Sequence, residues 1–126
     1  REELRLSKKI LIIDDSAVFR KVVSMNLKHA GYEVVEAVDG MDALSKLPTV
    51  KPNLIVCDVN MLNMDGLTFV SKVRADENNR FIPIIMLTTE SQEEKKKKGM
   101  EAGAKAWLVK PFAPEQLLSA ISKLIP

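Results

Sequence analysis

Four charged residues stand at the polar ends of short apolar runs: Asp14, Asp15, Asp58 and Lys110. The runs cover residues 10–13, 54–57 and 107–109. Each run is apolar on both faces, which is typical of a buried parallel strand. Because ligands bind at the carboxyl ends of such strands in an open α/β sheet, we expect the four charged groups to gather there. Three carboxylates repel one another unless a cation lies among them, and one lysine supplies a single positive charge, so the pattern predicts a bound divalent cation.

Asp58 is the best candidate for a nucleophile toward phosphorus. A carboxylate can form an aspartyl phosphate when a metal neutralises the incoming phosphoryl oxygens. Asp58 ends its strand alone, whereas Asp14 and Asp15 form a pair suited to holding a cation directly or through water. Mg²⁺ fits this division, because it keeps several waters and takes one or two carboxylates plus a phosphate oxygen. The alternative for the pair is helix capping and dipole compensation, and for Asp58 it is an ordinary loop start.

Thr88 and Lys110 complete the candidate site. The Thr88 hydroxyl could donate a hydrogen bond to a phosphoryl oxygen, and the Lys110 ammonium could pair with the same group. Taken alone, a threonine at a strand end is usually only a β-former. Lys110 precedes Pro111, and an X-Pro bond can be cis at low cost, so we hypothesise a cis bond that aims the lysine inward.

The composition fits one domain with a sizeable core, since the chain has 126 residues and 46% of them are apolar. The 19 basic and 17 acidic residues leave too small an excess to indicate a nucleic acid partner. No apolar stretch approaches the ~20 residues that span a bilayer, and the N-terminus lacks the apolar core of a signal peptide. The single cysteine, Cys57, lies in an apolar strand and is expected to be a buried thiol. We therefore expect a soluble, cytoplasmic protein without membrane insertion.

Apolar runs and helical stripes alternate five times along the chain. This predicts an α/β fold, a doubly wound five-stranded parallel sheet with helices on both faces. The expected strands cover residues 9–14, 33–37, 54–58, 83–88 and 107–110. The first helix should begin at a Ser16 cap and end at Gly31, and the second should open at Asp39 and end before Pro48. The expected inward face of the first helix consists of Phe19, Val22, Val23, Leu27 and Ala30.

The expected fourth helix, residues 91–102, differs from the others because it contains few apolar residues and four consecutive lysines at positions 95–98. Such a charge run is often just a solvated helix face. The alternative is that a weakly anchored helix forms part of a movable signalling face.

The candidate site residues and the segments around them, taken in their order along the chain, resemble those of the receiver domain of two-component response regulators. The matching positions are Asp14, Asp15, Asp58, residues 60–66 (Asn-Met-Leu-Asn-Met-Asp-Gly), Thr88 and residues 110–112 (Lys-Pro-Phe). The resemblance implies a flavodoxin-like (βα)5 receiver fold with the strand order 2-1-3-4-5. It places the receiver domain over residues 8–126, after an N-terminal extension over residues 1–7 to which we assign no function.

The resemblance also implies roles for the site residues. Asp58 would accept a phosphoryl group from a histidine kinase, with Mg²⁺ or another divalent cation held by Asp14, Asp15, Asp58 and the backbone carbonyl of Asn60. Thr88 and Lys110 would bind the phosphoryl group once it is attached.

A separate set of residues would carry the signal outward. The resemblance implies that Thr88, Glu90 and Trp107 act in a switch, with Glu90 also lying beside the phosphoryl group. The output face would cover residues 91–102, 107–109 and 114–125. Trp107 stands where chemotaxis regulators often have tyrosine, and Leu62 stands where the family usually has proline.

The chain ends after its fifth expected helix, so it looks most like the stand-alone chemotaxis type of response regulator. The expected partners are a sensor histidine kinase of the chemotaxis type and a downstream protein such as a flagellar motor switch component. A phosphatase is a further candidate partner, and direct contact with nucleic acid is not expected. On this interpretation the protein is a signalling switch and not an enzyme.

Three alternatives stay open at this point. The chain could be the receiver part of a DNA-binding response regulator. It could be a metal-dependent phosphohydrolase that forms and cleaves an aspartyl phosphate, although it has no room for a substrate-selecting cap domain. A flavin binder would share the fold, but Asp14 and Asp15 would repel the cofactor phosphate.

Overall fold

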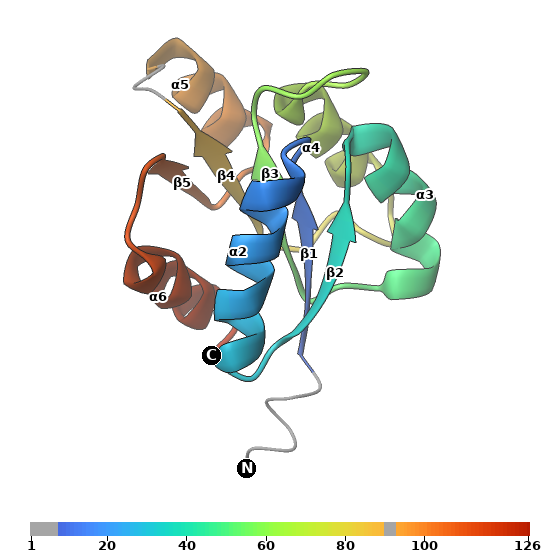
Figure 1. Ribbon diagram of the computed structural model, residues 1–126. Coiled ribbons are helices and arrows are strands. Elements are labelled where there is room, and N and C mark those ends of the chain that lie inside the picture. The colour runs from blue at the N-terminus through green and yellow to red at the C-terminus, as the bar shows by residue number, and fades with distance from the viewer. Residues whose placement is uncertain (1–7, 90–92) are drawn as a thin grey trace.

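Five parallel strands form one sheet in the order β2-β1-β3-β4-β5, with helices covering both of its faces (Figure 1). The computed structural model describes residues 8–89 and 93–126. Its strands are β1 (Lys9–Ile13), β2 (Glu33–Ala37), β3 (Leu54–Asp58), β4 (Ile84–Thr88) and β5 (Ala106–Val109). Its helices are α2 (Ala17–His29), α3 (Gly40–Val50), α4 (Gly66–Ala75), α5 (Glu93–Ala102) and α6 (Pro114–Leu124). The predicted fold class and strand order are confirmed, whereas the predicted extension over residues 1–7 lies outside the described residues.

Alternate side chains of the central strands supply two separate apolar cores. In β1, Ile10 and Ile12 pack with residues of α2 and α6, whereas Leu11 and Ile13 pack with residues of α3 and α4. Successive side chains of a strand point to opposite faces of a sheet, so a strand with helices on both sides must be apolar throughout. This is why the site residues follow unbroken apolar runs.

Three helices begin with a side-chain cap in the segment that follows the carboxyl end of a strand. Ser16, Asp39 and Asp65 each accept a hydrogen bond from the backbone N–H three residues later. Such caps satisfy one of the N–H groups that the first turn of a helix leaves unpaired. Because the strands are parallel, these strand-to-helix connections lie together at one edge of the sheet, the upper edge in Figure 1.

Two predictions about helices were wrong. Helix α3 does not stop before Pro48 but continues to Val50, and Lys51 ends it in the left-handed region at φ 49°. Proline removes one backbone hydrogen bond, which costs little when it lies in the last turn, because the following residues end the helix anyway. The predicted inward face of α2 was too wide, since Val22 is 52% exposed and Ala30 is also exposed. Val22 instead lines a groove of about 460 Å³ between α2 and α6.

Helix α5 is attached to the rest of the molecule by few side chains. Within residues 94–102, Gly99 is the single buried residue. A Cβ atom at Gly99 would lie 2.8 Å from Cζ3 of Trp107, so the absence of a side chain lets α5 approach the indole ring. The expectation of few apolar anchors in this helix is therefore confirmed for its described part. Among the helices in residues 8–89 and 93–126, none is long and apolar enough to cross a membrane.

Candidate functional site

Three carboxylates meet at the carboxyl ends of the neighbouring strands β1 and β3. Oxygen atoms of Asp14, Asp15 and Asp58 lie within 4.8 Å of one another. Asp14 and Asp58 are buried, while Asp15 is exposed. The structure thus brings together the three acidic residues that the apolar runs pointed to. An all-oxygen set of this kind fits a hard divalent cation such as Mg²⁺.

Lys110 reaches this cluster from the end of β5. Its Nζ atom lies 2.8 Å from Oδ2 of Asp14 and 3.6 Å from Oδ1 of Asp58. The same atom lies 4.0 Å from the centre of the Phe19 ring, which adds a cation–π contact. The Lys110–Pro111 peptide bond is cis, as hypothesised from the sequence. One cation therefore faces two buried carboxylates, which is too little positive charge to balance them.

Asp58 is held in an environment that opposes its ionisation. Burial, followed by the negative charge of Asp14, raises the pKa of Asp58 to about 6, and the positive charge of Lys110 offsets part of this increase. Its Oδ1 atom has no hydrogen-bond partner among the described residues. Since buried polar atoms are normally paired, this orphaned oxygen fits a site made to receive a cation or another ligand.

Thr88 lies at the end of β4, the strand next to Asp58 on the other side from Asp14. It is fully buried, and its Oγ1 atom also lacks a hydrogen-bond partner within the described ranges. Backbone pairing places Asp58 opposite Leu87, so Thr88 is one residue further along the neighbouring strand. The hydroxyl is therefore free to donate to a group bound near Asp58.

The loop after β3 approaches the Asp58 backbone closely. A Cβ atom at Gly66 would lie 2.5 Å from the carbonyl oxygen of Asp58, so glycine is required there for steric reasons. Asn60 is exposed on this loop, and its Oδ1 accepts a hydrogen bond of 3.2 Å from Nζ of Lys95 in α5. The metal-ligand role of the Asn60 backbone carbonyl stays a prediction.

Of the expected switch residues, Thr88 and Trp107 lie within the described ranges of the structure. Trp107 is half-buried and packs on the core formed with α3 and α4, next to Gly99 of α5. Glu90 lies outside the described residues. Trp107 of β5 therefore contacts α5, a helix with few buried side chains among its described residues.

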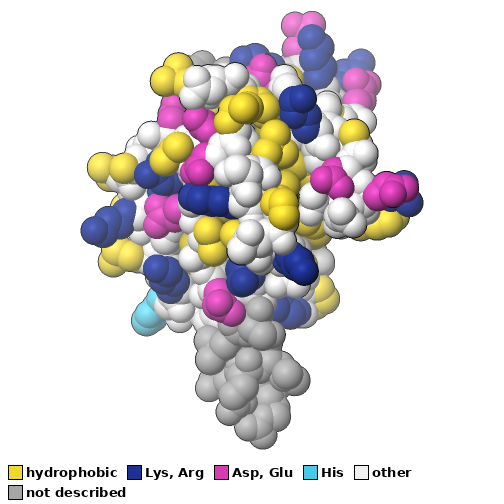
Figure 2. Space-filling view, turned by 90° about the vertical axis from the view of Figure 1, so that its right-hand side faces the viewer, with side chains coloured by type: hydrophobic (Ala, Val, Ile, Leu, Met, Phe, Trp, Pro, Cys, Tyr) yellow, Lys and Arg dark blue, Asp and Glu magenta, His cyan; other side chains and the backbone are white. Residues whose placement is uncertain are grey.

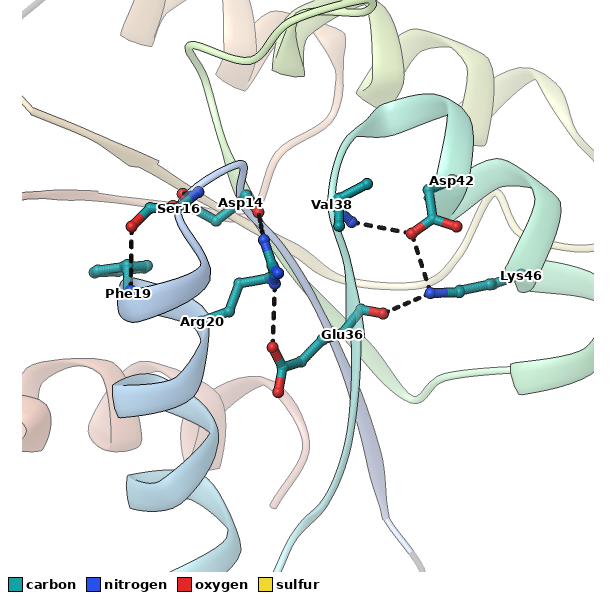
Figure 3. A network of polar contacts seen from close by, with 8 residues as sticks. All are labelled: Asp14, Ser16, Phe19, Arg20, Glu36, Val38, Asp42 and Lys46. Carbon is teal, nitrogen blue, oxygen red and sulfur yellow. Dashed lines mark hydrogen bonds and ion pairs between the residues drawn. The ribbon is translucent and has the colours of Figure 1, made fainter.

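The structure shows an arginine that sequence reasoning missed. Nη1 of Arg20 donates a hydrogen bond of 2.6 Å to the backbone oxygen of Asp14, and Nε donates one of 3.1 Å to Oε1 of Glu36 (Figure 3). The Ser16 N–H donates to Oδ1 of Asp14 at 2.8 Å. A usable signal was present, because an arginine in the first turn of a helix that follows two aspartates can reach back to them.

On the face shown in Figure 2, positive and negative side chains are interspersed. His29 is exposed and ends α2, the end opposite to the acidic cluster. His29 is therefore a surface residue remote from the candidate site.

Known proteins resemble the chain over nearly its whole length. Residues 10–122 match the response regulator receiver domain. The chain is 38% identical over 117 residues to the DNA-binding dual master transcriptional regulator RpaA of Synechocystis, covering 93% of this chain and 48% of RpaA. It is 40% identical over 111 residues to the chemotaxis protein CheY1 of Helicobacter pylori, covering 86% of this chain and 90% of CheY1. The chain thus spans about half the length of the first relative and most of the second.

Solved structures agree with this result. The chemotaxis response regulator CheY4 of Vibrio cholerae superimposes with a TM-score of 0.89 and is 47% identical, covering 94% of this chain and 98% of CheY4. The strand order, the acidic cluster and the lysine facing it occur within the matched residues. The chain belongs to the response regulator receiver domain family.

Proposed function

We propose that this chain works as a phosphorylation-activated switch in which Asp58 accepts a phosphoryl group from a sensor histidine kinase. Receiver domains interact with histidine kinases and with downstream targets, which supports this role. The observation that carries the proposal is the surroundings of Asp58. Its unpartnered Oδ1 lies 3.6 Å from a lysine and close to two further carboxylates at the open edge of the sheet.

In the proposed phosphoryl transfer, Asp58, Lys110 and Thr88 each have a distinct role. A carboxylate oxygen of Asp58 attacks phosphorus, so that an O–P bond forms while the N–P bond of the kinase's phosphohistidine breaks. The imidazole leaves with the electron pair of that bond. Lys110 and the Thr88 hydroxyl then bind oxygens of the new phosphoryl group.

A divalent cation, Mg²⁺ in this proposal, would be held by Asp14, Asp15, Asp58 and the backbone carbonyl of Asn60. When bound, it supplies positive charge that neutralises the phosphoryl oxygens during transfer. The family binds Mg²⁺ at an acidic pocket, and the oxygen cluster of this chain fits such an ion.

We further propose that the switch acts in the cytoplasm in chemotaxis, with a chemotaxis-type kinase and a target such as a flagellar motor switch component. The 47% identity to CheY4 and the 40% identity to CheY1 support this assignment. A second candidate is the receiver part of a DNA-binding regulator, because the chain spans 48% of RpaA. The two candidates share the site and differ in the partner of the output face.

Phosphorylation tests the proposal directly. The protein is incubated with a small phosphodonor such as phosphoramidate and Mg²⁺, and the modified peptide is mapped by mass spectrometry. One phosphoryl group per chain on Asp58 is expected, together with its loss in Asp58→Asn and its retention in the control Asp76→Asn, which changes an exposed aspartate. Full labelling of Asp58→Asn would contradict the assignment, and repeated turnover of an added phosphoester would favour the phosphohydrolase.

A further inference from the structure

Resting on the proposed function, we infer that Arg20 is a positioning residue for the metal-binding carboxylates. It acts through the backbone of the loop between β1 and α2, which carries Asp14 and Asp15. In this role its geometry matters more than its charge.

The guanidinium of Arg20 bridges two parts of the molecule (Figure 3). Nη1 donates to the backbone oxygen of Asp14 at 2.6 Å, and Nε donates to Oε1 of Glu36 on β2 at 3.1 Å. The side chain is only 13% exposed, so water competes weakly for these donors. Arg20 therefore ties the first residue of the acidic pair to the edge strand of the sheet.

Beside its contacts with Lys110 and with the Ala37 backbone oxygen, Asp14 is held from the helix α2 side at two further points. Arg20 holds the backbone oxygen, while the N–H of Ser16 holds the carboxylate Oδ1 at 2.8 Å. The backbone oxygen of Asp14 belongs to the peptide group that joins it to Asp15, so holding that oxygen limits how this peptide can rotate. The directions of both carboxylates depend on this peptide. Groups that orient metal ligands in this way commonly change metal affinity by about tenfold or more when they are removed.

The positive charge of Arg20, taken alone, would change Mg²⁺ affinity in the opposite direction. A guanidinium near three carboxylates lowers the negative potential that attracts a cation, so a purely electrostatic Arg20 would weaken Mg²⁺ binding. Removing it would then tighten binding, whereas removing a positioning residue loosens it. The sign of the change therefore separates the two roles.

Replacing Arg20 with lysine also distinguishes the positioning role from a purely electrostatic role. Arg20→Lys keeps the positive charge, but a single ammonium cannot reproduce the planar, two-donor geometry that serves the backbone of Asp14 and the carboxylate of Glu36. Lys46 offers a matched control. Its Nζ binds the backbone oxygen of Glu36 at 2.8 Å and Oδ2 of Asp42 at 3.0 Å, in the same polar network but away from the acidic loop (Figure 3).

The test is the dissociation constant for Mg²⁺, measured by titration calorimetry on the full chain, with thermal unfolding of the metal-free protein measured in parallel. We expect Arg20→Lys and Arg20→Gln both to weaken Mg²⁺ binding by about tenfold, and Lys46→Gln to stay within about twofold of the parent. A parent-like constant for Arg20→Lys, or tighter binding by Arg20→Gln, would overturn the positioning role.

A variant of the partner residue, Glu36→Gln, keeps the inference testable if the Arg20 variants do not fold. Glu36→Gln keeps an oxygen acceptor for Arg20 but removes the ionic part of the contact, so it should weaken Mg²⁺ binding by a smaller factor, about threefold. If both Arg20 variants unfold, a parent-like constant for Glu36→Gln would itself overturn the inference. Failure of the parent chain to bind Mg²⁺ would instead overturn the proposed metal site, and this inference with it.

Discussion

The ammonium of Lys110 lies 2.8 Å from Oδ2 of Asp14, so the lysine pairs with a carboxylate that the proposed metal site also uses. The distance from the same Nζ to Asp58 is longer, 3.6 Å. Lys110 and a divalent cation therefore compete for Asp14. Cation binding at Asp14 would release the ammonium toward Asp58, where the phosphoryl group is proposed to form.

Removing this ammonium should strengthen metal binding. We expect Lys110→Gln to bind Mg²⁺ roughly three- to tenfold more tightly, because a positive charge a few ångströms from the ligands is lost. Titration calorimetry measures the change, and Lys105→Gln, which removes an exposed lysine just before β5, is the control. Unchanged affinity in Lys110→Gln would mean that the ion pair does not compete with the metal.

Folding stability should depend on pH through Asp58. Its pKa is about 6 in the folded protein, against an ordinary value of 3.8. The folded state therefore holds this proton more tightly than the unfolded state does, so the contribution to stability is fully present below about pH 4 and is lost as the pH rises through about 6. A difference of about two pH units corresponds to at most about 3 kcal/mol.

Asp58→Asn isolates this contribution. In metal-free buffer the variant should have a free energy of unfolding about 2–3 kcal/mol above that of the parent at pH 8, and the difference should vanish near pH 4. Urea unfolding at several pH values measures it. An equal difference at pH 4 and pH 8 would show that the ionised carboxylate is not the cause.

Much of this fold could be predicted from the sequence because the strand signal is local. The observed bounds of β2 and β3 match the predicted ones, and β4 begins one residue late since Pro83 has no N–H to donate to the sheet. Because the carboxyl ends of parallel strands meet at one edge of the sheet, the sequence also predicted that the acidic residues lie close together. None of these steps needed knowledge of distant contacts.

Other features depend on contacts that no local pattern reveals. The sequence predicted Lys110 at the same edge as the acidic residues, but not its 2.8 Å pairing with Asp14, a residue 96 positions away. The ion pair of Arg20 with Glu36 forms only because folding places β2 beside α2. Val22 looks like a core residue by spacing, yet it lines the groove between α2 and α6 and remains half exposed. Tertiary packing decided these positions.

Gly66 should tolerate no side chain. In Gly66→Ala the new Cβ would lie 2.5 Å from the Asp58 carbonyl oxygen and 2.9 Å from the Cα of Val59, both of which are backbone atoms that cannot turn aside. We expect a loss of about 1–3 kcal/mol in the free energy of unfolding and slower phosphorylation of Asp58. Thr68→Ala, an exposed change on the same helix, is the control for both measurements. Parent-like stability and labelling of Gly66→Ala would show that the loop can move away freely.

The last prediction concerns how occupancy of Asp58 reaches the output face. A phosphoryl group there offers oxygens to the buried Thr88 hydroxyl, which has no partner among the described residues. Thr88 pairs with Val109 in β5, and Trp107 of the same strand contacts α5 at Gly99. A shift of the hydroxyl toward the phosphoryl group can therefore change the packing of the indole against a helix with few other anchors.

Trp107 is the only tryptophan, so its fluorescence reports this change without a label. Beryllofluoride with Mg²⁺, which mimics a phosphoryl group on the aspartate, should shift the emission of the parent and alter amide exchange in α5. Thr88→Ala should lose most of the shift while still binding beryllofluoride, because the hydroxyl that links the two parts is missing. Thr89→Ala changes the exposed neighbouring hydroxyl and should respond like the parent. A full emission shift in Thr88→Ala would show that the signal reaches Trp107 by another route, and no shift in the parent at confirmed occupancy would mean that this face is not the switch.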